Sequence, residues 1–161
     1  MKLKSVYSSA FSFLKNSQSS FQSVFSSSLE DCLEKYMKML LIAGLFASIA
    51  SFIIFLLNSL YLSIFRDVPI LAWRMLNYAV SVSSGYFMVY LFLGTFGLFL
   101  LVLLFKVFFR NIRLDALIKL FCYSMFPILL FGWIHPSLAY ALMVWSAFLV
   151  IVGIKSYSDK K

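Results

Sequence analysis

Few side chains in this sequence could carry out chemistry, and they lie far apart along the chain. The single histidine, His135, would need at least two more ligands to hold zinc, but no cysteine or acidic residue is close to it in sequence. The two cysteines, Cys32 and Cys122, lack the Cys-x-x-Cys spacing of a metal or redox site. We expect His135 to cap a helix end and the cysteines to be small packing residues, with reversible lipidation of Cys32 as an alternative.

The acidic residues do not suggest a catalytic pair. Asp67 directly follows Arg66, and Asp115 lies two residues after Arg113. Each is therefore expected to form an ion pair at a membrane border rather than to relay protons. Because catalysis needs several polar groups that converge, the sequence predicts a non-enzymatic protein without catalytic, cofactor-binding or metal-binding residues.

Composition sets the class of protein. Of the 161 residues, 63% are hydrophobic and 12% are charged, which excludes an ordinary soluble domain. The chain has 14 Lys and Arg against 6 Asp and Glu, a net charge of +8. Such an excess suits nucleic-acid binding in a soluble protein and cytoplasmic flanks in a membrane protein. No basic domain lies outside the apolar stretches, so we expect membrane lipids, and not nucleic acid, as partners.

The apolar stretches predict an all-α integral membrane protein, a four-helix transmembrane bundle. A helix needs about 20 apolar residues to cross a bilayer core of about 30 Å. The charge-free stretch from Leu120 to Ile154 is too long for one crossing, and Gly132 and Pro136 mark its turn. The expected spans are residues 39–58, 85–105, 115–133 and 137–154. They divide the chain into an arm (1–38), a transmembrane domain (39–155) and a basic tail (156–161).

Residues 68–84 leave the number of spans open. This segment is apolar but short, and contains Pro69, Arg74, Asn77 and several serines. We interpret it as an interfacial or re-entrant segment, with a fifth span as the alternative. With four spans, 12 of the 14 Lys and Arg residues fall on one face of the membrane. The positive-inside rule then places both termini in the cytoplasm.

The amino-terminal arm is rich in serine and has one apolar stripe. At 100° per residue the stripe comprises Tyr7, Phe11, Leu14, Phe21, Phe25, Leu29, Cys32 and Tyr36. It predicts an amphipathic helix on the cytoplasmic membrane surface, with docking to a partner helix or a flexible tail as alternatives. A signal peptide and a coiled coil fit less well, because serines interrupt the apolar residues. Ser28 starts a capping pattern, so we expect a break at residues 26–28 before the helix restarts.

Two further features suggest contacts. The basic residues Lys106, Arg110, Arg113 and Lys119 are expected to hold lipid headgroups or a cytosolic partner, or only to mark topology. Small residues recur at helix-packing spacing, as Ala43, Ala47 and Ser51 in the first span and Gly94 and Gly97 in the second. They favour a packed bundle and a complex with other membrane proteins or with itself.

A proline interrupts the third predicted span. Pro127 cannot donate a backbone hydrogen bond, so we expect a kink that frees the carbonyl of Tyr123. Broken helices occur in transporters, but the predicted spans hold no ionisable residue at mid-membrane. A small oligomeric transporter or channel is therefore the alternative to a membrane-organising or complex-forming subunit.

Residues 84–156 resemble the carboxy-terminal half of Yip1-domain membrane proteins. The resemblance rests on Tyr123-x-x-x-Pro127-x-Leu-Leu and on a final span that runs from Trp145 to Gly-Ile-Lys155. The glycine-rich loop that often precedes the Tyr and Pro stretch in the family is absent, and many relatives are assigned five spans. The resemblance implies an integral membrane protein without catalytic residues. Together with the small size, it suggests a prokaryotic-type protein of the cell membrane.

Overall fold

The computed structural model describes residues 17–66 and 72–158, which form helices and short turns with no strand in these ranges. The helices are α2 (Ser17–Ser26), α3 (Leu29–Arg66), α4 (Ala72–Phe108), α5 (Leu114–Ser124), α6 (Phe126–Phe131) and α7 (Pro136–Ser158). The predicted all-α fold is confirmed. Residues 1–16, which include Tyr7, Phe11 and Leu14, lie outside the described part of the chain.

Four segments are long and apolar enough to cross a membrane: α3, α4, the α5–α6 pair and α7. The chain is thus a multi-pass membrane protein. At 1.5 Å per residue, the 38 residues of α3 and the 37 of α4 extend about 57 and 55 Å, whereas the 23 residues of α7 extend about 34 Å. The first two helices are therefore much longer than a bilayer core requires.

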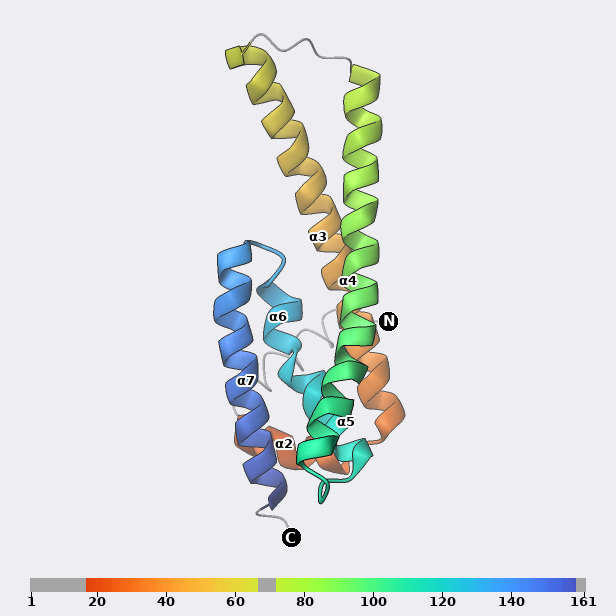
Figure 1. The fold of residues 1–161 in the computed structure, drawn as a ribbon, viewed down its shortest axis with the longest axis vertical. Coiled ribbons are helices and arrows are strands. Elements are labelled where there is room, and N and C mark those ends of the chain that lie inside the picture. The colour runs from red at the N-terminus through yellow and green to blue at the C-terminus, as the bar shows by residue number, and fades with distance from the viewer. Residues whose placement is uncertain (1–16, 67–71, 159–161) are drawn as a thin grey trace.

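The α5–α6 pair forms the centre of the bundle. It packs against α3, α4 and α7. Helix α2 crosses one end of the bundle, where it packs against α5 and α7 (Figure 1). Nearly every side chain from Ala116 to Pro127 is buried. The α3–α4 hairpin extends well beyond the turn between α6 and α7 (Figure 1). Helices α2, α5 and the end of α7 thus gather at one end, and the hairpin projects from the other.

Local sequence signals set the helix ends at this end of the bundle. Helix α2 stops at Ser26, and the backbone N–H of Asp31 donates to the Ser28 hydroxyl at 3.1 Å. This bond satisfies one of the free amides at the start of α3, as a serine N-cap does. The predicted break and helix restart are confirmed.

The turn between α6 and α7 lies where the sequence predicts it. Helix α6 ends at Phe131, and the Trp133 indole N–H donates to the Leu130 carbonyl at 2.8 Å. Nδ1 of His135 accepts a hydrogen bond from the Ser137 amide at 3.2 Å, so this histidine caps α7 as expected.

The predicted interfacial segment at residues 68–84 is corrected by the structure. Residues 72–84 form the first part of α4 and continue without interruption into the second span. They are therefore not a separate membrane crossing. The serines that made the segment look irregular fit a helix. The hydroxyls of Ser81 and Ser83 donate to the carbonyls of Asn77 and Ala79, one turn earlier.

The third span is broken, as predicted, although the break precedes the proline. Helix α5 ends at Ser124, Met125 lies between the helices, and Pro127 occupies the first turn of α6. A proline is tolerated in a first turn because the amide it lacks has no helical partner there. The predicted single span over 115–133 is therefore two short helices.

Close contact between α3 and α4 depends on small residues. A Cβ on Gly94 would overlap the side chain of Leu40, so these helices approach as closely as glycine permits. Beside it, the Tyr36 hydroxyl donates to the Gly94 carbonyl at 2.7 Å. Ala43 and Ala47 are buried, as the spacing predicts, whereas a Cβ on Gly97 would meet nothing within 4 Å.

Candidate functional site at the basic end of the bundle

Helix α2 is docked against the rest of the chain through its apolar face. Phe21 has no exposed surface, and its ring would lie 3.0 Å from a Cβ placed on Gly153 of α7. The ring of Phe25 meets Tyr157 edge to face, with centroids 5.3 Å apart. Gln22, which faces away, is exposed. The amphipathic pattern is confirmed for α2, and its apolar face packs on α5 and α7.

The predicted membrane or partner contact of Phe21 is therefore corrected. This ring is fully enclosed by its own chain, so it cannot touch lipid while α2 is docked. Phe25 is half-buried and packs against the same protein. The periodic pattern indicates that one face is buried, but it carries no information on what covers that face. The glycine at 153 explains the result, because it leaves room for the ring.

Lys119 is the most unusual cation of this end. Only 5% of it is exposed, and its Nζ donates to the carbonyl oxygens of Ser27 at 2.5 Å and Phe25 at 3.3 Å. These carbonyls lie at the carboxyl end of α2, where the helix dipole is negative and the oxygens have no helical donors. No acidic side chain of the described residues forms an ion pair with it.

The predicted headgroup role of Lys119 is corrected on the same grounds. A buried ammonium needs several hydrogen bonds to offset the loss of its hydration. The end of α2 supplies them, so Lys119 fastens α2 to α5 rather than facing lipid phosphates. The sequence carried no signal for this contact, because Lys119 and Ser27 come from distant parts of the chain.

The other three predicted cations lie in and beside the turn between α4 and α5. Lys106 donates to the carbonyls of Arg110 and Ile112 at 2.9 and 2.6 Å and so holds the turn. Arg113 makes two hydrogen bonds to Asp115, at 3.1 and 3.0 Å, which confirms the predicted pair. Arg110 and Arg113 are exposed, and their contact with headgroups or a cytosolic partner stays a prediction.

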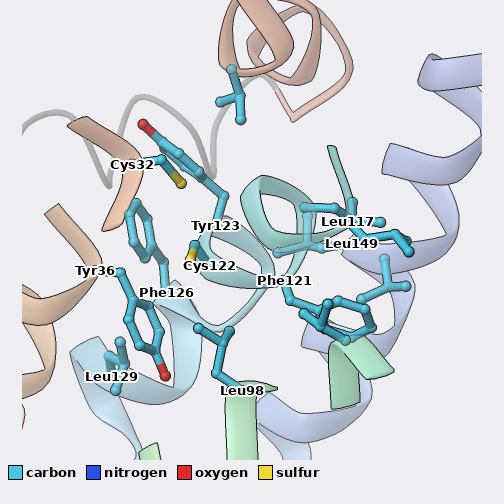
Figure 2. Close-up of a cluster of buried hydrophobic side chains, with 14 of the residues drawn as sticks. Cys32, Tyr36, Leu98, Leu117, Phe121, Cys122, Tyr123, Phe126, Leu129 and Leu149 are labelled. Atoms are coloured by element: carbon cyan, nitrogen blue, oxygen red, sulfur yellow. The ribbon is translucent and has the colours of Figure 1, made fainter. Parts of the chain in front are cut away.

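The two cysteines belong to one buried cluster near this end. Cys32 on α3 and Cys122 on α5 are both buried, among side chains that include Tyr36 and Phe126 (Figure 2). Tyr123, whose ring lies 4.7 Å from that of Phe126, belongs to the same buried cluster. Tyr123 and Pro127 of the family-like motif are thus core residues. Both cysteines are buried packing residues, as predicted.

The opposite end of the protein has a large exposed apolar surface. The ring of Phe46 on α3 stacks on Trp133 of the α6–α7 turn, with centroids 5.1 Å apart. The next 20 residues of α3, about 30 Å of helix, therefore extend past that turn. We call residues 47–66 and 72–86 the projecting hairpin. Its most exposed apolar side chains are Ile54, Leu57, Ile64, Phe65, Trp73 and Tyr78.

Within residues 17–66 and 72–158, no three potential metal ligands lie together. Lys106 and Lys119 are engaged by backbone carbonyls. Comparisons with protein-family models, curated proteins and solved structures find no match for this chain.

Proposed function

We propose that this multi-pass membrane protein is a non-enzymatic membrane-organising or complex-forming subunit. The observation that carries the proposal is the projecting hairpin. It exposes large apolar side chains on two helices that their own chain leaves mostly uncovered. An exposed apolar patch of this extent is typical of a surface that contacts the membrane or another protein.

Helix length supports a role for the projecting hairpin in binding. Helix α7 extends about 34 Å, close to the thickness of a bilayer core, whereas α3 and α4 extend about 20 Å further. The thickness of one bilayer therefore cannot match the lengths of both the α3–α4 hairpin and α7 if these helices stand perpendicular to the membrane. Another membrane protein, or a second copy of this chain, would cover the apolar surface that the bilayer leaves in water.

The same proposal assigns the basic end to the cytoplasm of a prokaryotic-type cell membrane. Lys106, Arg110, Arg113 and Lys155 lie in or near the turn between α4 and α5 and the end of α7, which share one end of the bundle (Figure 1). Such clustering of cations fits the positive-inside rule. The arm before α2, with Tyr7, Phe11 and Leu14, would contact lipid or a cytosolic partner.

The test compares polar substitutions on two exposed apolar surfaces. In the projecting hairpin, Ile54→Asn with Leu57→Asn changes side chains that are 62% and 61% exposed; the control Val144→Asn changes one on α7 that is 73% exposed. Each protein is extracted in mild detergent and its co-purifying proteins are quantified. We expect the hairpin variant to lose most of its co-purifying protein and the control variant to retain it. Equal assembly in both variants would contradict the proposal.

A small oligomeric transporter or channel is the second candidate, and the break in the central span favours it. The helix is interrupted at Met125, and the buried hydroxyl of Ser124 beside it has no hydrogen-bond partner among the described residues. Transporters often place broken helices at their substrate sites. Flux in proteoliposomes, compared with a Pro127→Ala variant, tests this candidate. Reproducible flux that the variant changes would support it and would defeat the subunit proposal.

A further inference from the structure

One face of α3, near the basic end of the bundle, is left uncovered by the described helices. At 100° per residue, its four side chains fall within about 60° of one another. We call them the α3 seam: Glu34, Lys38, Leu41 and Leu45. All four are at least partly exposed. The residues that α3 buries against the bundle, Ala43 among them, lie on the opposite side of the helix.

The charged half of the seam lies at a depth where the neighbouring helix exposes only apolar side chains. A Cβ on Gly94 of α4 would overlap the side chain of Leu40, so these two residues are level with each other. Helices α3 and α4 run in opposite directions (Figure 1), and Glu34 is therefore level with about Leu100. Leu100 is exposed and lies six residues, about 9 Å, before Lys106. The charges of the seam thus lie deeper than the cation that ends the second span.

Lipid alone is a poor cover for this face. Charged side chains are unfavourable against hydrocarbon, and in membrane proteins they usually face the interior of a bundle, where they pair. Glu34 and Lys38 form an ion pair along one turn of α3, but both remain partly exposed. The pair can therefore accept a second partner that carries charges of both signs at the same depth.

We propose that the α3 seam binds the same seam of a second copy of this chain. Two copies have the same orientation in the membrane, so their α3 helices would be parallel. The seam residues follow one another at spacings of four, three and four, which is the pattern of a coiled-coil interface. A twofold axis brings identical surfaces together, so Lys38 of each copy would lie within one turn of Glu34 of the other.

The charge pattern favours a second copy over other occupants. Each seam presents one acidic and one basic residue, so two seams neutralise each other without any further protein. The leucines one and two turns later would pack across the same axis. The seam lies outside the projecting hairpin, so this inference goes beyond the proposed function and does not depend on it.

Cysteine cross-linking in native membranes tests the contact. In the full-length protein, Leu45→Cys places a thiol on the seam, and the control Leu100→Cys places one on α4; the two leucines are 53% and 61% exposed. The native cysteines are buried and common to both proteins. After oxidation with copper phenanthroline, Leu45→Cys should give at least about tenfold more disulfide-linked dimer, because a twofold axis brings equivalent seam positions within disulfide range.

Charge exchange tests the pairing between copies. Glu34→Lys and Lys38→Glu each make the pair like-charged, both within a chain and between two copies of the same variant. Co-purification of differently tagged copies in mild detergent should therefore fall at least about tenfold below wild type for each variant alone. When the two variants are expressed together, opposite charges meet only between chains. The mixed dimer should then recover to near the wild-type amount, which a misfolded variant could not do.

Three results would overturn the inference. The first is no co-purification of two tagged wild-type copies, and the second is no excess of the Leu45→Cys cross-link over the Leu100→Cys control. The third is co-purification that neither charge variant lowers, or that their co-expression does not restore. The Ile54→Asn, Leu57→Asn protein should lose the proteins bound through the projecting hairpin and keep the Leu45→Cys cross-link, so failure of this inference is distinguishable from failure of the proposed function.

Discussion

Replacing Phe21 by alanine tests how α2 is held. The ring is fully buried between α2, Gly153 and Leu120, and its removal leaves a cavity that the two helices cannot close without moving. Buried Phe→Ala substitutions cost about 3–5 kcal/mol in protein cores. We take the lower end, about 3 kcal/mol, because an undocked α2 can rest its apolar face on the headgroup region. At 1.4 kcal/mol per tenfold change, the docked state should weaken about 100-fold.

Hydrogen exchange of the α2 amides in nanodiscs measures this change directly. If opening limits exchange, the protection of residues 21–26 should fall by the same factor of about 100 in Phe21→Ala. The matched control is Gln22→Ala, which removes an exposed side chain from the next position of the same helix. It should leave protection within about twofold. Unchanged protection in Phe21→Ala, or an equal loss in both variants, would refute the docking of α2 through this ring.

Three further substitutions test other contacts. Lys119→Met removes two charge-assisted hydrogen bonds to the end of α2. Hydrogen exchange of the α2 amides should therefore become about 10- to 100-fold faster. The control Lys155→Met changes an exposed lysine and should leave this exchange unchanged. Gly153→Ala places a Cβ against Leu120 and Phe21 and should lower the free energy of unfolding by about 1–2 kcal/mol. The control Gly97→Ala places its Cβ in open space and should raise the free energy of unfolding slightly. Thermal unfolding in detergent compares the two variants. Tyr36→Phe removes the bond to the Gly94 carbonyl and should cost about 1 kcal/mol in the same assay, against no change for exposed Tyr61→Phe.

Much of the architecture could be predicted because membrane crossing and helix ends depend on local sequence. Charge-free stretches of about 20 residues located the four crossings. Ser28, His135 and Pro127 act within one or two turns of their own positions, so the restart of α3, the cap of α7 and the break in the central span were all predictable from nearby residues. Each of these signals is complete within a few residues.

The rest could not be predicted because it depends on contacts between distant parts of the chain. The stripe through Phe21 indicates a buried face, but lipid, a partner and α7 would all satisfy the same periodicity. Lys119 was grouped with the headgroup-binding cations because its acceptors, at the end of α2, belong to another part of the sequence.

Residues 72–84 were misinterpreted for a different reason. Serine and asparagine lower helix propensity, and the preceding proline and charges suggested a boundary. In the structure the serine hydroxyls bond back to carbonyls of the same helix, so α4 continues without interruption. Helix propensity is a weak guide where polar side chains can form hydrogen bonds within the helix and tertiary packing supports that helix.

Native mass spectrometry of the protein, released from its own membranes in mild detergent, tests the central claim most directly. The account predicts an assembly of fixed stoichiometry, with other membrane proteins or with copies of this chain. The assembly should fall apart in the Ile54→Asn, Leu57→Asn protein and persist in Val144→Asn. A lone monomer from native membranes, in every detergent mild enough to keep known membrane complexes intact, would contradict it.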